Sequence, residues 1–335
     1  MKKILLFISI TIIMCSCSLF DIKTPTEINL VTIALDYKNA PNINNLYGTI
    51  NDAKELNKAL SLMSERNQVN FNSHNFYQIG IDYSNEYISQ ITYPSKYNII
   101  EAIKNLNKKS SENSINIIYF SGHSDSNGNL LLATTNTNDG SYFFTDNDTI
   151  CENQTLSVDE LYDNLNNTNG KFIIISDSCY SGSLYKGNSY SIEEEIFTFN
   201  KAFENLFSKE SKKSNIYILS ATEKDNTAHE PGYNVGNRQH GYFTKALLEG
   251  LGWCDGEKGT LSSQILPDYT DKDGIQGVLA EGDPPAINKK ILSIDSLYEY
   301  IIENQEINLV SDSEFVPHQY PCISSGRFDV ALFTY

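Results

Sequence analysis

The chain has 335 residues, of which 40% are hydrophobic and 20% are charged, as is usual for a globular protein. This length is enough for one large domain or two small ones. The formal net charge of −17 at pH 7 argues against nucleic acids and anionic membrane surfaces as electrostatic partners, because both are bound through basic patches. A basic substrate would suit this charge.

The first residues of the chain have the pattern of an export signal. A pair of lysines precedes an apolar stretch, residues 4–14, that is too short to span a bilayer. Ser16 followed by Cys17 resembles the lipobox of bacterial lipoproteins, in which the signal is removed and the cysteine becomes a lipidated N-terminus. We therefore expect residues 1–17 to be a lipoprotein signal peptide, and the mature protein to be exported and anchored through Cys17 on the periplasmic or cell-surface side of a membrane. A plain signal peptide with incidental cysteines is the alternative.

Beyond a polar tether at residues 18–28, strand-like runs alternate with helix-like patterns through one expected domain, residues 29–335. The expected strands, rich in β-branched and aromatic residues, are 29–37, 76–81, the runs that begin at Ile115 and Phe172, 216–220 and 328–332. The expected helices are one capped by Asn51 or Asp52, one capped by Ser95, one that starts at 156–161, and 192–207, 242–251 and 292–302. Residues 125–152 have the composition of loops or a small hairpin. This alternation predicts an α/β fold with a mainly parallel sheet and helices on both faces.

Two of the expected strands stop abruptly at a reactive residue. The first run ends in Ser-Gly-His123 and the second in Asp-Ser-Cys179. Strand ends are where parallel-sheet enzymes present their chemistry, and a cysteine attacks as a thiolate when a base such as histidine is near. The pattern predicts a catalytic dyad of Cys179 and His123. Taken singly, each residue has a bland alternative, because buried cysteines are usually inert packing and histidines are usually surface or hydrogen-bonded core residues.

The sequence motifs around this pair resemble those of a known family. Tyr-Phe-Ser-Gly-His at 119–123 and Asp-Ser-Cys-Tyr-Ser-Gly at 177–182 are similar to the two signatures of caspase-fold peptidases (peptidase family C14), and the metacaspases and bacterial caspase-like proteins are the closer branch. Further segments that resemble the family are 46–53, 219–225 and 241–248. The resemblance covers about residues 29–251, and residues 252–335 match more loosely. It implies a caspase-like (caspase-hemoglobinase) fold and a cysteine-type endopeptidase.

The resemblance also implies roles for the residues of the dyad. His123 would be the general base and the acid for the leaving group, and Cys179 would be the nucleophile that forms an acyl-enzyme. Backbone N–H groups of Cys179 and of the residue after the histidine would bind the oxyanion. The family usually has glycine at this second position, and here it is Ser124. If the loop needs a positive φ, serine would be strained there by roughly 1 kcal/mol.

Metacaspases cleave after Arg or Lys, and the resemblance implies an acidic substrate pocket that contains Asp52 and Asp177, with Ser121 in its lining. A pair of carboxylates can bind a guanidinium by charge-assisted hydrogen bonds. Aspartate-specific caspases instead present arginines to the substrate, and this chain has only Arg66, Arg238 and Arg327. The alternative is that Asp52 caps a helix and Asp177 shapes a turn.

No cofactor is expected to be required. Many metacaspases bind Ca²⁺ through aspartates, so calcium activation stays open as an alternative, with Asp146, Asp148 and Asp159 as candidate ligands. Lys186 argues against it, because it stands about where the family has an acidic ligand, and acidic loops are more often simply solvated. The other cysteines of the expected mature chain show no Cys-x-x-Cys unit, so neither a disulfide framework nor a zinc site is expected; they are Cys151, Cys254 and Cys322.

Three functions are compatible with these observations. The first is a lipid-anchored cysteine endopeptidase, a monomer by its resemblance to metacaspases, that acts on proteins or peptides with basic residues. The second is a catalytically weak or inactive caspase-fold lipoprotein that serves as a binding or scaffold module. The third is another Cys/His hydrolase or an acyltransferase, because the same attack chemistry serves these reactions.

Overall fold

The structure is a computed structural model. It describes residues 24–37, 43–78, 93–125, 127–132, 134–135, 142–143, 155–165, 169–179, 215–223, 226–231, 239–256, 259–261, 274–305, 307, 319–323 and 330–335. Some sequence predictions therefore lie outside the described residues: the lipobox with Cys17, the helix at 192–207, and Asp146, Asp148, Cys151 and Lys186.

A six-stranded sheet forms the centre of the molecule, in the order β13-β9-β8-β3-β1-β2. Its strands are β1 (Glu27–Leu35), β2 (Asn70–Gln78), β3 (Ser114–Ser121), β8 (Lys171–Asp177), β9 (Ile216–Ser220) and β13 (Cys322–Ile323). All neighbouring strands are parallel except β13, which pairs antiparallel with β9 at the edge. The predicted mainly parallel sheet is confirmed.

The central strands are buried on both faces, which explains their nearly continuous apolar sequence. In β1 the side chains alternate between two hydrophobic clusters, with Ile28, Leu30 and Ala34 in one and Val31, Ile33 and Leu35 in the other. Strand β8 divides in the same way, because Ile173 and Ile175 join the first cluster and Phe172 and Ile174 join the second. Side chains of successive strand residues point to opposite faces, so each strand supplies both cores.

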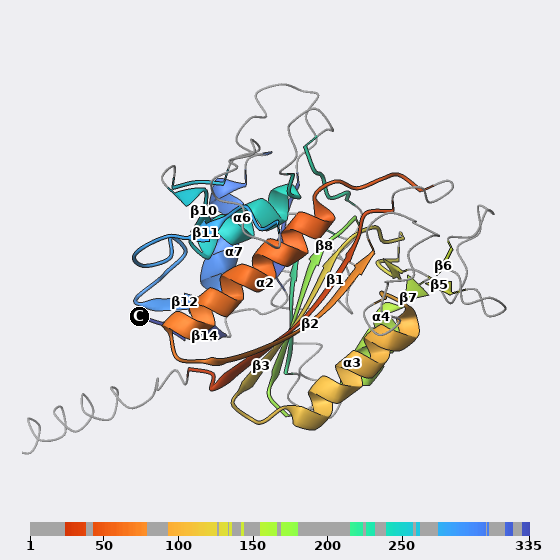
Figure 1. Ribbon diagram of the computed structural model, residues 1–335, viewed down its shortest axis with the longest axis horizontal. Helices are drawn as coiled ribbons and strands as arrows, with labels where there is room; N and C mark the ends of the chain where they lie inside the picture. Colours follow the sequence, from red (N-terminus) through yellow and green to blue (C-terminus); the bar gives the residue numbers. More distant parts are fainter. Residues whose placement is uncertain are drawn as a thin grey trace, which may run out of the picture.

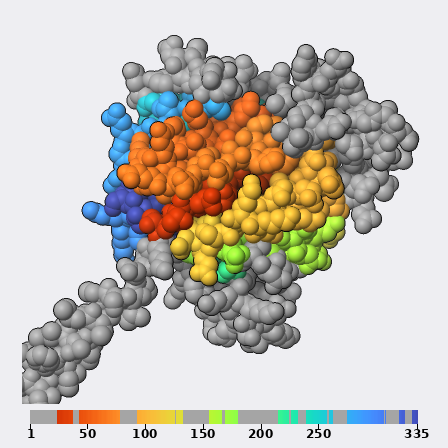
Figure 2. All heavy atoms as spheres, turned by 60° about the horizontal axis from the view of Figure 1, so that its bottom comes forward, coloured from red at the N-terminus to blue at the C-terminus, as the bar shows by residue number. Residues whose placement is uncertain are grey.

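Helices cover both faces, as the sequence predicted (Figure 1). Their bounds are α2 (Thr49–Arg66), α3 (Lys96–Lys109), α4 (Val158–Leu165), α6 (Tyr242–Gly250) and α7 (Ile294–Asn304). Helices α2, α6 and α7 contribute to the first cluster, and α3 and α4 contribute to the second. Figure 2 shows these layers from another side, with a narrow red band of the first strand between the orange α2 region and the yellow α3 region.

Within the described ranges, four small two-stranded sheets accompany the central one. They pair β4 (Leu130–Leu131) with β7 (Thr155–Leu156), β5 (Thr134–Thr135) with β6 (Tyr142–Phe143), β10 (Trp253–Cys254) with β11 (Val278–Leu279), and β12 (Ile291–Ser293) with β14 (Ala331–Thr334). All four pairs are antiparallel. The hairpin expected within 125–152 is present as β5 and β6. No helix among the described residues is long and apolar enough to cross a bilayer.

Several predicted boundaries needed correction. Helix α2 begins at Thr49 with Gly48 as its N-cap, so the prediction that Asn51 or Asp52 caps it is wrong. Ser95 does cap α3, since its side chain accepts a hydrogen bond from the N–H of Asn98. Strand β1 starts at Glu27, within the expected tether, and β2 starts at Asn70, six residues before the predicted position. The expected helix at 292–302 begins with the short strand β12, and Ser293 at the end of that strand caps α7.

Candidate active site

The predicted dyad residues follow two strands that are neighbours in the sheet. Strands β3 and β8 run parallel, and their last register pair joins Ser121 to Asp177. His123 and Cys179 each lie two residues beyond this pair. Neighbouring strands are about 4.8 Å apart, so the register brings both residues to the same end of the sheet. In this structure no hydrogen bond joins the two side chains, and each is bonded to a backbone carbonyl instead.

The ring of His123 is oriented by two residues that the sequence analysis did not identify. Its Nε2 lies 2.7 Å from the carbonyl oxygen of Asn44. A carbonyl can only accept a hydrogen bond, so Nε2 carries the proton and Nδ1 is left to act as a base. The hydroxyl of Tyr37 accepts the backbone N–H of His123 at 3.0 Å, and the two rings lie tilted with centroids 4.7 Å apart.

Close packing at this loop requires glycine before the histidine. A Cβ on Gly122 would lie 2.7 Å from the Tyr37 hydroxyl and 2.8 Å from the ring of Phe120. Both distances are shorter than real carbon contacts, so a side chain here would displace Tyr37 or the strand end. The glycine in the Ser-Gly-His motif is therefore explained by steric packing.

The environment favours the uncharged form of both dyad members. Burial lowers the pKa of His123, although the hydrogen bond to Asn44 acts in the opposite direction. Burial raises the pKa of the Cys179 thiol, and the charge of Asp177 raises it further, against the hydrogen bond to Ala228. A neutral imidazole next to a protonated thiol is the arrangement in which the base takes the proton as the thiol attacks.

Ser124 makes contacts that a glycine could not make. Its hydroxyl donates to the carbonyl oxygen of Cys179 and to Ser178 Oγ at 3.3 Å. Its φ is not positive, so the expectation of backbone strain does not hold. Ser124 also pairs with Leu130 in an antiparallel bridge whose hydrogen bonds, at 2.9 and 3.1 Å, are made by the flanking residues. In such a pair the N–H of Ser124 itself points away from Leu130, and it is left for another acceptor.

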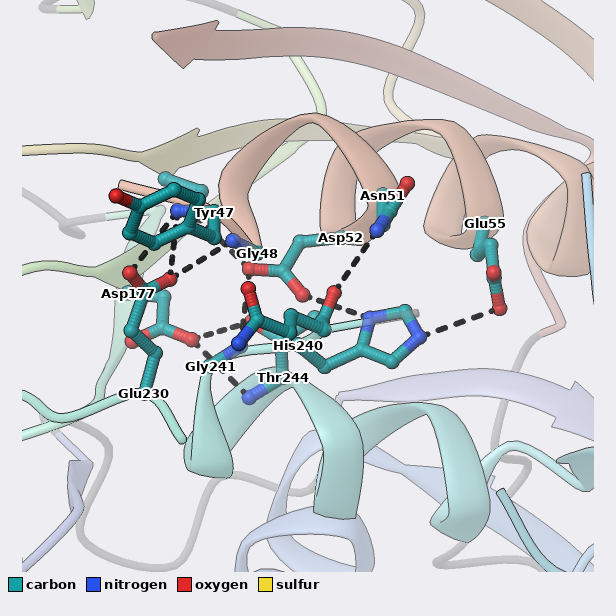
Figure 3. Close-up of polar contacts among 12 residues, drawn as sticks. Tyr47, Gly48, Asn51, Asp52, Glu55, Asp177, Glu230, His240, Gly241 and Thr244 are labelled. Atoms are coloured by element: carbon teal, nitrogen blue, oxygen red, sulfur yellow. Dashed lines mark hydrogen bonds and ion pairs between the residues drawn. The ribbon is translucent and has the colours of Figure 1, made fainter. Parts of the chain in front are cut away.

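The three residues expected to bind substrate lie together at the ends of β3 and β8 and the start of α2. Asp52, in the first turn of α2, accepts hydrogen bonds on Oδ2 from Ser121 Oγ at 3.0 Å and from the N–H of Gly241 at 3.4 Å. Its Oδ1 accepts Nδ1 of His240 at 2.8 Å (Figure 3). Burial raises the pKa of Asp52 above its usual value, although the hydrogen bond from His240 acts in the opposite direction.

Asp177, at the end of β8, binds the start of α6. Its Oδ2 accepts the N–H of Thr244 at 3.2 Å and the hydroxyl of Thr244 at 2.7 Å (Figure 3). The N-cap of α6 is Gly241, which has no side chain to cap the helix, so Asp177 supplies the missing acceptor from another element. Burial raises the pKa of Asp177 to about 7, and the neighbouring negative charge of Asp52 contributes to this shift.

Glu230 is an acidic neighbour that the sequence analysis missed. Its carboxylate accepts the N–H groups of Tyr47, at 2.9 and 3.1 Å, and of Gly48, at 2.8 Å (Figure 3). Gly48 is the N-cap of α2, so Glu230 does for α2 what Asp177 does for α6. Burial raises the pKa of Glu230, and the charge of Asp52 raises it too. We call Asp52, Asp177, Glu230 and the histidine beside Asp52, His240, the acidic cluster.

Other features lie away from this site. Asp159 is in the first turn of α4, and no group of three or more His, Cys, Asp or Glu residues in the described part of the chain could bind a metal ion. None of the described cysteines, Cys179, Cys254 and Cys322, forms a disulfide. A cavity of about 660 Å³ lies beside the C-terminal half of α2, where Arg66 and Trp253 line it, and none of its lining residues belongs to the dyad or the acidic cluster.

Comparison with known proteins identifies the family of the chain. The family model described as "Caspase domain" matches residues 31–327. No curated protein matches the chain. Among solved structures, a protein from Geobacter sulfurreducens is similar at 17% identity and a TM-score of 0.43, over 89% of this chain and 92% of that one. Caspase-1 from Spodoptera frugiperda is similar at 12% identity and a TM-score of 0.45, over 91% of this chain and 89% of that one. With the family model matching most of its length, the chain belongs to the caspase domain family of peptidases.

Proposed function

We propose that this protein is a cysteine endopeptidase that cleaves peptide bonds after Arg or Lys through Cys179 and His123. A caspase domain supports a peptidase-like function with protein substrates. The observation that carries the finer proposal is the register of β3 and β8, which brings His123 and Cys179 to one end of the sheet beside a buried acidic cluster. An inactive scaffold has no need for this combination.

The reaction follows from the positions of the donors and acceptors. His123 takes the thiol proton on Nδ1 while the sulfur of Cys179 bonds to the substrate carbonyl carbon. The carbonyl oxygen becomes an oxyanion, and the backbone N–H groups of Ser124 and Cys179 stabilise it. His123 then gives its proton to the leaving amine as the C–N bond breaks. Water, with His123 again as base, hydrolyses the thioester and restores the thiol.

The acidic cluster supports the choice of a basic residue before the cut. Asp177 Oδ1 accepts no hydrogen bond from the described residues, whereas Oδ2 is bound to Thr244. A guanidinium or ammonium group beside Asp177 would exchange its hydrating water molecules for hydrogen bonds to carboxylates. Burial strengthens such charge-assisted hydrogen bonds. The aspartate side chain that aspartate-specific caspases recognise would be repelled.

A panel of fluorogenic peptides that end in Arg, Lys or Asp tests this proposal. We expect wild-type protein to cleave after Arg and Lys but not after Asp, and we expect Cys179→Ala and His123→Ala to cleave none of them. Addition and chelation of Ca²⁺ during the same assay test the calcium alternative. If folded wild-type protein cleaves no peptide, the scaffold function is favoured and the endopeptidase proposal fails.

We further propose that the mature protein is a lipoprotein anchored through Cys17. The support is the sequence pattern alone, a lysine pair and an apolar run before Ser16 and Cys17. Expressed in a bacterium, the full chain should partition into the detergent phase of a Triton X-114 separation, and Cys17→Ser should move it to the aqueous phase. Equal partition of the two proteins would contradict the anchor.

A further inference from the structure

The acidic cluster contains a buried histidine that takes no part in the dyad. His240 directly precedes Gly241, the N-cap of α6, and only 4% of its surface is exposed. The residue before it is fastened to α2, because Asn51 Nδ2 donates to the carbonyl of Gln239 at 3.1 Å. His240 is therefore fixed against the first turns of α2.

Two carboxylates of α2 face the two ring nitrogens of this histidine. Asp52 Oδ1 lies 2.8 Å from Nδ1, and Glu55 Oε2 lies 3.5 Å from Nε2 (Figure 3). Both carboxylates are almost completely buried, at 1% and 2% exposure. Glu55 Oε2 also accepts the indole N–H of Trp253 at 2.5 Å. The result is a continuous buried line of polar contacts from Trp253 through Glu55 and His240 to Asp52.

A cationic imidazole lowers the net negative charge of this line from two to one. Burying an unpaired carboxylate is costly, and two carboxylates that face a neutral ring would be left without a counter-charge. Burial alone disfavours the charged ring, but Glu55 and Asp52 outweigh it and raise the pKa of His240 to about 9. Among the described residues, the other charged members of the acidic cluster are the carboxylates of Asp177 and Glu230. His240 is thus the cation that faces Asp52.

We propose that His240 is a positioning residue for substrate specificity, which keeps Asp52 ionised and turns its Oδ2 toward the end of β3 where a basic substrate side chain would bind. The inference rests on the proposed function, because it explains how the cluster recognises a cation. With Oδ1 occupied by His240, the second oxygen faces Ser121 and Gly241. Without the imidazolium, burial would favour a protonated Asp52, which cannot form a salt bridge with arginine.

The experiment compares peptides ending in arginine and in citrulline, a neutral side chain of the same shape. Binding is measured by fluorescence anisotropy in a Cys179→Ala background, so the result does not depend on turnover. We expect His240→Asn to reduce the preference for arginine by about tenfold or more, although its amide can still donate to Asp52. Glu55→Gln is the graded comparison: it removes one of the two carboxylates that favour the His240 cation but leaves the His240 and Asp52 pair in place, so it should reduce the preference less than His240→Asn.

Charge rescue separates this role from simple packing. Without the imidazolium, the negative charge of Glu55 disfavours the ionised form of Asp52. The double variant His240→Asn with Glu55→Gln removes this charge, so it should regain part of the preference for arginine. A packing role predicts that the double variant binds no better than His240→Asn. Unchanged preference in His240→Asn would overturn the inference.

A measurement on the unmutated protein covers the case in which the variants do not fold. The ¹⁵N shifts of the His240 ring, assigned by replacing the other histidines singly, should show both nitrogens protonated at neutral pH. A neutral ring would overturn the inference. Failure of the proposed function itself has a different signature, namely that the Cys179→Ala protein binds arginine and citrulline peptides equally.

Discussion

At the scale of single residues, the two aspartates of the acidic cluster differ in their ionisation. Asp52 faces the cation of His240, whereas the carboxylate of Asp177 has no cationic partner among the described residues and accepts hydrogen bonds from Thr244. Burial, with the charge of Asp52, raises the pKa of Asp177 to about 7. Asp177 is therefore neutral below this pH and charged above it, so its contribution to binding a cation appears as the pH rises.

This difference predicts a pH dependence of specificity. We expect the ratio of kcat/KM for arginine over citrulline peptides to increase as the pH rises through about 7, because Asp177 gains its charge. The ratio cancels the titration of Cys179 and His123, which acts equally on both peptides. Asp177→Asn should remove the increase. A ratio that is constant across neutral pH in wild-type protein would contradict this assignment.

Ser124 joins the histidine loop to the cysteine loop, and this predicts an effect on catalysis. Ser124→Ala removes the hydroxyl that bonds to the carbonyl of Cys179 but keeps the backbone N–H. We expect kcat to fall roughly threefold to tenfold with little change in KM, because the nucleophile is less well oriented. Ser178→Ala, which removes only one of the two partners of Ser124, is the matched control and should have a smaller effect. A variant Ser124→Ala that is as active as wild type would show that the contact has no catalytic role.

At the scale of elements, the site depends on the close approach of two helix N-termini. Both α2 and α6 have glycine N-caps without side-chain caps, and carboxylates from other segments take their place. A Cβ on Gly48 would lie 2.9 Å from backbone atoms of His240 and Gly241. The absence of side chains at both caps thus allows His240 and Asp52 to meet.

Gly241→Ala should therefore destabilise the protein. The added Cβ would lie 2.2 Å from Asp177 Oδ2, so the helix or the carboxylate must move. Overpacking of this kind costs about 1–3 kcal/mol, which should lower the midpoint of urea unfolding. Gly241 has a φ of −58°, which alanine adopts without strain, so the loss of stability comes from packing. If Gly241→Ala is as stable as wild type, α6 does not pack against Asp177 as described.

The sequence predicted the strands better than the ends of the helices. Apolar runs such as Phe172–Ile175 are buried on both faces, and this leaves a strong local signal. The cap of α2 was predicted wrongly because Asp52 looks like a capping residue, while its side chain is used by His240, 188 residues further along the chain. Glu55, Glu230 and His240 have no local motif, since their roles depend on partners that only folding brings near. The placement of His123 and Cys179 at one end of the sheet was predictable because each lies two residues after a strand.

At the scale of the whole molecule, the net charge of −17 should attract basic substrates over a distance. Salt screens such long-range attraction but affects buried pairs much less. We expect kcat/KM for an arginine peptide to fall severalfold from low to high ionic strength, and kcat/KM for the citrulline peptide to change little. A residual preference for arginine should remain at high salt, due to Asp52 and Asp177. Equal salt dependence of the two peptides would show that the net charge does not contribute.

The central claim is that Cys179 attacks the backbone carbonyl carbon of an arginine or lysine in the substrate, with His123 as the base. Intact mass spectrometry after treatment with an arginyl acyloxymethyl ketone peptide tests this most directly. The account predicts a single adduct on Cys179, absent in Cys179→Ala, strongly slowed in His123→Ala, and not formed with the corresponding aspartyl peptide. No adduct on folded protein, an adduct on Cys254 or Cys322, or equal labelling by the aspartyl peptide would contradict it.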